Sequence, residues 1–316
     1  MNQTTKQTGG IIVAAKKKIW ENQAHFMRPV GSISAIKRIV LTFLKAEISP
    51  IVIITGYDAD VIEHELATYS IIFIKTKNYD QLELLAHAQA GIQYLQGKCD
   101  QVLFTPVDMP LFSPDTLVRL TQMDALAAAP SYKRKGGHPI LLSSELFPNI
   151  LSYRGDGGIV GALQASGIER QWLEVEDRGI LSSLDHLEQD AELISAHNEL
   201  LFRPFLRVWL EKDTSFMGGR IKLLLMLIDE THSVSEACAH IPVSYSKAWK
   251  MLNHLEKELG YEVVARKQGG KHGGKTGLTP AGKKFLEDYS TFEYRVRQFA
   301  MEEFEHIFIN PQSRSN

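Results

Sequence analysis

The stretch from Ser233 to Thr279 limits the possible folds of this chain more than any other part of it. Ser233 and Glu236 have the spacing of a capping box, in which a serine and a glutamate satisfy free amides at the start of a helix. A turn containing a proline follows, and a second helical pattern begins at Ser244 and stops at Gly260. Two short β-like runs then flank a tip rich in glycine and lysine. This order predicts a helix-turn-helix with a wing, which is a DNA-reading module.

The second helix of this stretch has one apolar face and one polar face. Ala248, Leu252, Leu255 and Leu259 recur at three- and four-residue spacing and should face the core. The other face and the wing carry donors and acceptors that suit base edges and phosphates, and we expect DNA contacts from Ser244, Tyr245, Ser246, Lys247, Lys250, Asn253, Arg266, Lys267, Lys271, His272 and Lys275. From Ser244 to Lys284 there are nine Lys or Arg residues and three Glu residues, so the positive charge is local. The alternative for the tip is a flexible hairpin with solvated charges.

The first two hundred residues have a different pattern. Apolar runs at 11–15, 50–56, 70–75 and 101–105 alternate with helical patterns. Continuous apolar strands between helices predict an α/β domain with a Rossmann-like, mostly parallel sheet that is covered on both faces. In such sheets, ligands bind beyond the carboxyl ends of the strands.

The length of 316 residues allows two domains, and the Phe-Arg-Pro-Phe run that starts at Phe202 suggests a boundary between 1–202 and 203–316. The two cysteines, Cys99 and Cys238, have no metal-binding spacing and read as buried thiols of a reducing compartment. There is no signal-peptide pattern and no apolar run near 18 residues. We therefore expect a cytoplasmic protein without a membrane partner. The net charge of −2 does not exclude nucleic acid, because an acidic domain can mask a basic patch.

A carboxylate follows the apolar run at 101–105. In the segment Pro106 to Pro114, Asp108 leaves the predicted strand end, and Ser113 and Pro114 can start the next helix. Carboxylate oxygens at such an edge suit Mg²⁺ shared with phosphates. An ordinary turn aspartate is the alternative.

Four segments in this half occur in a recognisable order. They are VDMPLFSPDTL from Val107, GGHPILL from Gly136, LSYRGDGGIVGAL from Leu151, and the acidic stretch from Val175 to Asp185. Together they resemble the motifs of the MobA/MocA-like molybdenum-cofactor nucleotidylyltransferases, over roughly residues 10 to 200.

This resemblance implies the transfer of a cytidylyl or guanylyl group from CTP or GTP to molybdopterin. It also implies that Asp108 holds Mg²⁺, that Asp185 completes the metal site, and that His138 and Asp156 line the acceptor pocket.

The chain departs from this family where the triphosphate should bind. The family begins with a glycine-rich loop, but this chain has Ala14, Ala15, Lys16, Lys17 and Lys18, with Lys16 in place of the first glycine. The three lysines either neutralise phosphates as point charges or form a solvated basic loop. His25 stands where the family has its catalytic lysine, and Arg28 is close enough in sequence to contribute charge. The resemblance therefore predicts the fold more firmly than the activity.

The second half has a resemblance of its own, from about Arg220 to Tyr289. The segments SYSKAW from Ser244 and RKQGGKHGGKTGLTPAG from Arg266 are similar to the winged helix of ModE-type, LysR-related molybdate-responsive regulators. Regulators of that family carry molybdate-binding domains after the winged helix, whereas this chain continues into one long helical pattern. Any sensing would therefore come from the N-terminal half.

The last helical pattern, within residues 280–308, has aromatic and aliphatic residues at heptad-like spacing: Phe285, Tyr289, Phe292, Val296 and Phe299. This seam predicts a homodimer, and packing against its own domain is the alternative.

Three functions follow from these patterns. The first is a DNA-binding transcriptional regulator of molybdenum-cofactor metabolism, whose N-terminal domain senses a nucleotide or a pterin-type ligand. The second is an active Mg²⁺-dependent molybdopterin cytidylyl- or guanylyltransferase fused to a DNA-binding module. The third is a scaffold for other proteins, against which the local basic surface argues.

Overall fold

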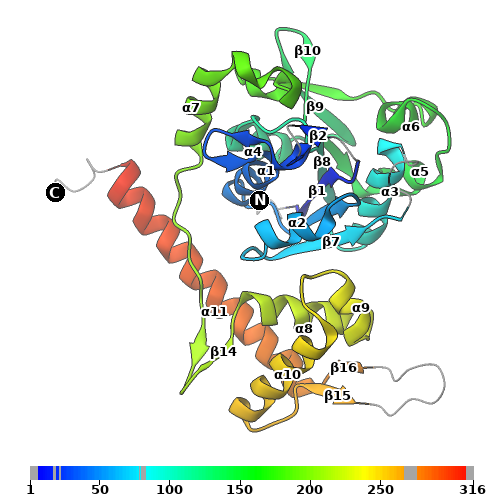
Figure 1. The fold of residues 1–316 in the computed structure, drawn as a ribbon. Coiled ribbons are helices and arrows are strands. Elements are labelled where there is room, and N and C mark those ends of the chain that lie inside the picture. Colours follow the sequence, from blue (N-terminus) through cyan, green and yellow to red (C-terminus); the bar gives the residue numbers. More distant parts are fainter. Residues whose placement is uncertain are drawn as a thin grey trace. The chain divides into compact units, whose positions relative to one another are not determined.

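A computed structural model of the chain describes residues 6–310, apart from 17–18, 21–22, 78, 80–82 and 267–275. The chain divides into two compact units (Figure 1). The first unit contains residues 1–66 and 71–202, and the second contains residues 67–70 and 203–316.

The first unit is built on an eight-stranded sheet with the order β10-β9-β11-β8-β1-β6-β7, in which β12 also pairs with β9. Its central strands, all parallel, are β8 (Gln101–Pro106), β1 (Thr8–Ala14), β6 (Ile51–Thr55) and β7 (Ile71–Lys75). These strands are the predicted apolar runs, and they are buried because helices cover both faces of the sheet. The predicted α/β class with a mostly parallel central sheet is confirmed.

The other strands of the sheet extend it past β8. They are β9 (Ala127–Tyr132), β10 (Lys135–Gly136), β11 (Ile140–Ser143) and β12 (Gln171–Glu174). Strand β11 is antiparallel to both β8 and β9, and β12 is parallel to β9. Between β1 and α1 lie three short elements, the hairpins β2–β3 (Ile19–Trp20 and Gln23–Ala24) and β4–β5 (Pro29–Val30 and Ile33–Ser34) and the helix η1 (His25–Met27).

Helices cover the two faces of this sheet (Figure 1). Helices α1 (Ala35–Lys45) and α4 (Pro114–Thr121) lie on one side, and α3 (Leu84–Leu95), α5 (Phe147–Ser152) and α6 (Gly158–Ala165) lie on the other. Two adjacent glycines of β1 explain how closely the helices approach. A Cβ on Gly10 would lie 2.5 Å from the Phe43 ring of α1, and one on Gly9 would lie 2.9 Å from Leu95 of α3.

The remaining helices of this unit connect the strands and close the chain. Helix α2 (Ala59–Glu65) ends early enough for the chain to turn before β7 starts at Ile71. The segment after β12 forms the short helices η3 (Arg178–Leu181) and η4 (Leu184–Gln189) and then α7 (Ala191–Leu200).

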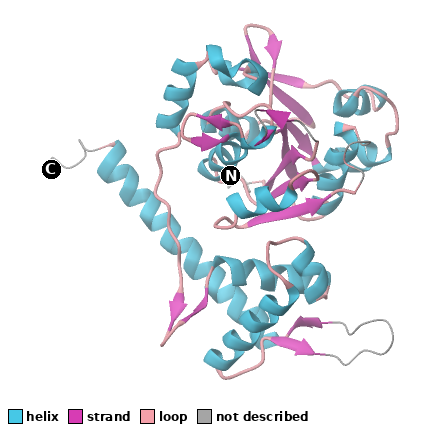
Figure 2. Ribbon diagram, viewed as in Figure 1, coloured by secondary structure: helices cyan, strands magenta, loops and turns pink. Residues whose placement is uncertain are grey.

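The second unit has the predicted order of a winged helix-turn-helix (Figure 2). It contains α8 (Gly219–Thr231), α9 (Val234–Ala239) and α10 (Tyr245–Leu259), the wing strands β15 (Val264–Arg266) and β16 (Thr276–Leu278), and the long helix α11 (Pro280–Phe304) with a π-helical end (Glu305–Ile309). The apolar alternation at 206–211 would suit a strand, but only Leu210 and Glu211 pair with β14 (Ser215–Met217), so the strand is limited to β13 (Leu210–Glu211). Among the described residues, no helix is long and apolar enough to cross a membrane.

Candidate functional site

The loop after β1 is the predicted phosphate-binding loop. Both alanines before Lys16 are buried, and the carbonyl of Ala15 accepts a hydrogen bond from the amide of Tyr57 at 3.1 Å. Lys16 follows them and is exposed. The predicted phosphate contacts of Lys17 and Lys18 lie outside the described residues. Lys16 is therefore the one lysine of this loop that the structure places at the carboxyl edge of the sheet.

Backbone hydrogen bonds place the two predicted metal-site carboxylates at the same edge. The amide of Val107 donates to the carbonyl of Val13 at 3.0 Å, which extends the pairing of β8 with β1 up to Asp108. The carbonyl of Asp108 then accepts a hydrogen bond from the amide of Leu184 at 2.8 Å. Because Asp185 follows Leu184 directly, the two carboxylates are held close together.

His25 lies between these carboxylates. Its side chain is only 5% exposed, with Nδ1 2.9 Å from Oδ1 of Asp108 and Nε2 3.5 Å from Oδ1 of Asp185. The contact with Asp108 is a hydrogen bond, and the contact with Asp185 is longer. The predicted metal-site pair is thus bridged by a side chain of the protein, at the position that the sequence assigns to catalysis.

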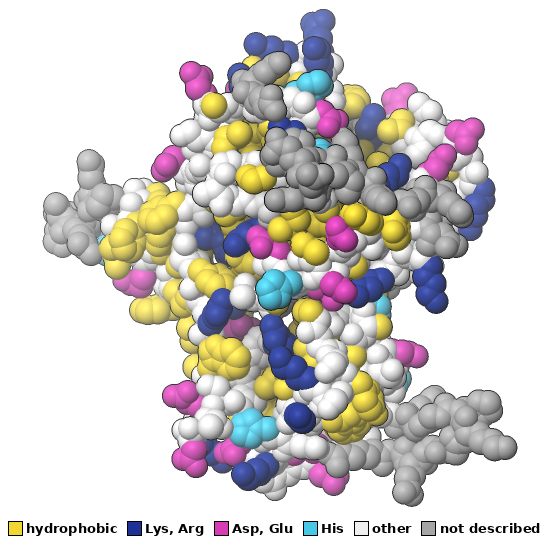
Figure 3. All heavy atoms as spheres, viewed as in Figure 1, with side chains coloured by type: hydrophobic (Ala, Val, Ile, Leu, Met, Phe, Trp, Pro, Cys, Tyr) yellow, Lys and Arg dark blue, Asp and Glu magenta, His cyan; other side chains and the backbone are white. Residues whose placement is uncertain are grey.

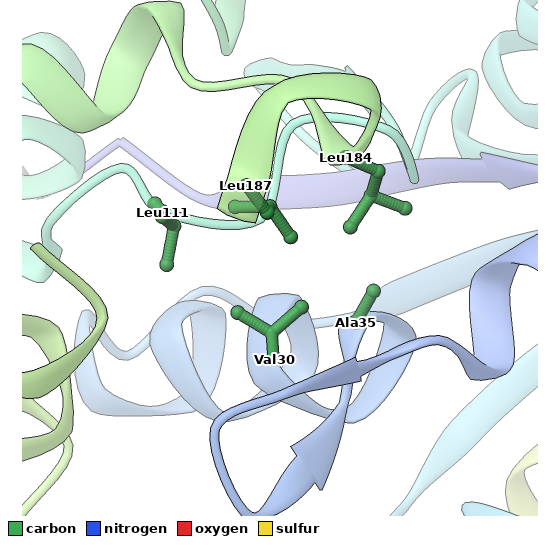
Figure 4. Close-up of a cluster of buried hydrophobic side chains, with 5 residues drawn as sticks. All are labelled: Val30, Ala35, Leu111, Leu184 and Leu187. Carbon is green, nitrogen blue, oxygen red and sulfur yellow. The ribbon is translucent and has the colours of Figure 1, made fainter. Parts of the chain in front are cut away.

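Arg28 holds the segment that carries Asp185. Its side chain is buried, and Nη1 donates a hydrogen bond to the carbonyl of Leu184. Leu184 also belongs to a buried apolar cluster that joins this segment to the start of α1 (Figure 4), made of Val30, Ala35, Leu111, Leu184 and Leu187. The structure therefore brings His25, Arg28, Asp108 and Asp185 together, with Arg28 bonded to the backbone of the site.

The pair of carboxylates has the chemistry of a magnesium site that substrate completes. The side chains of Asp108 and Asp185 are 40% and 54% exposed, so their oxygens reach solvent. Mg²⁺ is commonly held by one or two carboxylates together with water and substrate phosphates. Among the described residues there is no group of three side chains that could hold a metal ion. The donor set thus fits Mg²⁺ only in the presence of a phosphate ligand.

The two residues predicted to line an acceptor pocket lie elsewhere. His138 follows β10 and packs near the Phe104 ring, with the ring centroids 6.3 Å apart. The pKa of His138 is lowered to about 4, mainly by burial and also by the positive charge of Arg170. A hydrogen bond with the Phe104 backbone raises the pKa, but by less than burial lowers it. Asp156 is exposed in the loop before α6, where its carbonyl accepts a hydrogen bond from the Tyr153 hydroxyl. Within the described part of the chain, no hydrogen bond or ion pair joins either residue to the His25 cluster.

A pair of residues close to His138 belongs to no recognised motif. Arg170 directly precedes β12 and Trp172 is its second residue, and the Cζ atom of Arg170 lies 4.8 Å from the centroid of the Trp172 ring. Their spacing of two residues could have suggested this contact, because residues i and i+2 of an extended segment share one face. No motif of the first half includes either residue.

Helix α10 separates its apolar and polar residues as predicted. Ala248, Leu252 and Leu255 are fully buried. The Ser244 hydroxyl accepts a hydrogen bond from the amide of Lys247 at 3.3 Å and so caps the helix. The predicted DNA-contacting side chains of the helix are all exposed: Ser244, Tyr245, Ser246, Lys247, Lys250 and Asn253.

The wing is anchored to this helix, whereas its tip is outside the described residues. The carboxylate of Glu256 accepts hydrogen bonds from the amides of Val263 and Val264 at 2.9 and 3.0 Å, at the start of β15. The register of β15 with β16 pairs Arg266 with Thr276. The predicted contacts of Lys267, Lys271, His272 and Lys275 fall on residues that the structure does not describe, as does the side chain of Arg266.

Comparison with known proteins separates the two halves in the same way. Residues 23–175 match the family model of the MobA-like NTP transferase domain. A solved nucleotidyl transferase from Methanothermobacter thermautotroptrophicus superimposes with a TM-score of 0.52 at 18% identity, over 61% of this chain and 98% of that one, which shows a shared fold.

The C-terminal region matches curated molybdenum-related proteins. It is 37% identical over 89 residues to the molybdenum-pterin-binding protein MopB of Rhodobacter capsulatus, covering 28% of this chain and 33% of that protein. It is 34% identical over 78 residues to the transcriptional regulator ModE of Haemophilus influenzae, covering 25% of this chain and 31% of that one. The chain thus spans about a third of the length of these relatives. Both resemblances drawn from the motifs are confirmed.

Proposed function

We propose that this protein is a DNA-binding transcriptional regulator linked to molybdenum or molybdenum-cofactor metabolism, and that its first unit binds a nucleotide or a pterin-type ligand. The observation that carries the proposal is helix α10, which fully buries Ala248, Leu252 and Leu255, leaves Leu259 half-buried, and with its N-cap Ser244 exposes six hydrogen-bonding side chains. The similarity of this region to a regulator named ModE supports it. We expect such a regulator to act in the cytoplasm.

In this proposal, α10 enters the major groove of double-stranded DNA. The residues at the start of such a helix reach base edges, while lysines and wing residues contact phosphates. The exposed Tyr245, Ser246 and Lys247 lie in the first turn of α10. Lys250 lies one turn further, where its charge can approach a phosphate.

The first unit supplies the ligand site. Its His25, Asp108 and Asp185 cluster lies at the carboxyl edge of a parallel sheet, where ligands of such folds bind. Asp108 and Asp185 would hold Mg²⁺, which neutralises phosphate charge when a nucleotide is bound. Without the glycine-rich loop, and with His25 already engaged by both carboxylates, this site is better suited to binding than to turnover. We therefore favour a sensing role.

Two copies of the chain would pair through α11. The first part of this helix packs on its own unit, since Tyr289 is buried and its hydroxyl donates to the carbonyl of Val208 at 2.8 Å. Further along, Phe292 and Phe299 are 48% and 65% exposed. Hydrophobic side chains gather at this end of the helix (Figure 3). Unpaired apolar residues on a helix suit a self-complementary dimer contact, which would present two winged helices to two half-sites.

The test of the DNA-binding proposal starts from duplexes selected by the full-length protein from a random-sequence pool. Binding of a selected duplex is then measured by fluorescence anisotropy at several salt concentrations. Lys250→Ala should weaken binding and lower the slope of log K against log salt by about 1, because one phosphate contact is lost. Lys257→Ala, an exposed lysine in the last turn of α10, should change binding by less than about twofold, because the N-terminal part of a recognition helix makes the base contacts. Failure to select any duplex, or an equal effect of both variants, would contradict the proposal.

The second candidate function is an active nucleotidylyltransferase. The convergence of His25, Arg28, Asp108 and Asp185 favours it, because all four residues were assigned to that activity from the sequence. Calorimetric titration with CTP and with GTP, with and without Mg²⁺, separates the two functions. Mg²⁺-dependent binding that Asp108→Asn abolishes, together with release of pyrophosphate, would favour the enzyme. Binding without pyrophosphate release would favour the sensor.

A further inference from the structure

Within the described part of the first unit, Arg170 is a cation without a counter-ion. Among the residues that the structure describes, its guanidinium makes no hydrogen bond and no ion pair, and its contact is with the ring of Trp172. Burial lowers the pKa of Arg170, so the charge is partly removed from water. A dehydrated charge is unfavourable unless a partner compensates it. No such partner occurs in the described part of the chain, which points to a ligand.

The guanidinium is held in place by a stack of three groups. Gly136 of β10 has no side chain, and a Cβ there would lie 2.4 Å from the Trp172 ring. The indole ring therefore lies against the backbone of β10, although Trp172 is 51% exposed overall. Arg170 lies over this ring at 4.8 Å from its centroid. Stacking fixes the plane of a guanidinium while its N–H groups remain available to an acceptor.

Other groups around this stack add positive charge and a free acceptor. Three consecutive exposed cations follow β9: Lys133 and Arg134 form the turn, and Lys135 begins β10. His138 comes two residues after Gly136, and its Nδ1 atom is buried without a hydrogen-bond partner among the described residues. The positive charge of Arg170 is one of the causes that lower the pKa of His138. The same edge of the sheet thus offers a fixed guanidinium and a positive field, and the free imidazole nitrogen can accept a hydrogen bond from a phosphate oxygen that carries a proton.

We propose that Arg170 binds a phosphate group of the ligand of the first unit, in a subsite that His138 also lines. The guanidinium fork matches two oxygens of a phosphate, which forms paired, charge-assisted hydrogen bonds. The subsite is chemically distinct from the cluster of His25, Asp108 and Asp185, whose two carboxylates repel a phosphate unless a metal ion is present. The inference rests on the proposed ligand-binding function and adds to it the anchor of the ligand and its chemical class, a phosphomonoester.

The experiment uses the full-length protein and inorganic phosphate as the probe, in buffer without divalent metal. Trp172 reports binding by its fluorescence, and Trp172→Phe identifies its share of the signal. We expect a saturable change that Arg170→Gln weakens about 10-fold or more, because a charge-assisted pair is lost. Arg170→Lys should give a smaller loss, because it keeps the charge but not the fork.

Matched controls separate a built subsite from diffuse attraction. Arg134→Gln removes the same charge from the neighbouring turn and should change the affinity by less than about twofold. An equal loss in Arg134→Gln and Arg170→Gln would overturn the proposal, as would an unchanged affinity in Arg170→Gln. Binding that requires Mg²⁺ would place the phosphate at the carboxylate cluster and also overturn it, and so would equal affinity for acetate. Because phosphate alone is titrated, the result does not depend on whether the protein binds DNA.

Discussion

At the scale of single residues, the link between α1 and α7 depends on a neutral histidine. Arg38 is fully buried, and its Nη1 lies 3.0 Å from Nδ1 of His197. Nε2 of His197 lies 3.0 Å from the carbonyl of Phe112. A guanidinium can only donate, so Nδ1 accepts from Arg38 and Nε2–H donates to Phe112. Burial lowers the pKa of His197 to about 4, against the opposing effect of the Phe112 backbone.

This histidine makes the stability of the first unit sensitive to acid. The pKa of His197 falls from 6.5 to about 4 on folding, so the unfolded chain takes up the proton first. Its contribution is fully present above about pH 6.5 and is lost as the pH falls toward 4. Between pH 7 and pH 5, the free energy of unfolding should drop by about 2 kcal/mol on account of this residue. Urea unfolding at both pH values measures this drop in the free energy of unfolding. The drop should be smaller in His197→Gln. It should be the same as in the parent protein in His64→Gln, which replaces an exposed histidine of α2.

At the scale of elements, Ser244 has two roles that can be separated. It is a predicted DNA contact, and its hydroxyl also caps α10 by accepting the amide of Lys247. Ser244→Ala should lower the free energy of unfolding of the second unit by about 1 kcal/mol, because an N-cap is lost. Ser244→Asn should restore it, because asparagine caps equally well. Thermal or urea unfolding of the two variants tests this, and equal stability in Ser244→Ala and the parent protein would mean that the cap is not used.

The buried carboxylate of Glu293 links helices α8 and α11. Glu293 accepts hydrogen bonds from Lys222 at 2.8 Å and Arg297 at 2.9 Å. Burial alone would raise the pKa of Glu293, but these two cations outweigh it and the pKa is lowered. The stabilisation is therefore present above about pH 4.5 and is lost as the pH falls below it. Glu293→Gln should cost about 2 kcal/mol at pH 7 and flatten the acid limb of the unfolding curve, whereas the exposed Glu303→Gln should do neither.

The elements were easier to predict from sequence than their partners were. Buried parallel strands are continuous apolar runs, and caps such as Ser244 have a local signature, so these could be recognised directly. The run at 206–211 looked equally strand-like, but a strand requires a partner, and pairing is not visible in a local pattern.

The functional sites were hard to predict for the same reason, because their contacts join residues that are distant in sequence. Motifs suggested His25, Asp108 and Asp185 one by one. Their contact could not be predicted, because His25 and Asp108 are 83 residues apart in the sequence and only the folded chain brings them together. The stack of Arg170 on Trp172 depends on Gly136, which is distant in sequence, and no motif predicted it.

At the scale of the whole molecule, the proposed dimer depends on the long helix α11. The predicted heptad seam is divided in the structure: Tyr289 is buried in its own unit, and Phe292 and Phe299 remain exposed. The alternative that the seam packs on its own unit therefore describes its first part, and we propose the dimer contact for the exposed part beyond it. Two exposed phenylalanines seven residues apart lie on one face of a helix, as a dimer contact requires.

Phe299→Glu should therefore convert a dimer into a monomer, because a charge placed in an apolar contact loses its hydration without gaining a partner. Sedimentation equilibrium at micromolar concentration measures the change. The control is Val118→Glu, which introduces the same charge at a 37% exposed apolar position on α4 and should leave the dimer intact. A monomeric parent protein, or a Phe299→Glu variant that stays dimeric, would rule out this contact. If the dimer is the DNA-binding form, Phe299→Glu should also weaken binding to a duplex with two half-sites much more than to one with a single half-site, since only the dimer can occupy both at once.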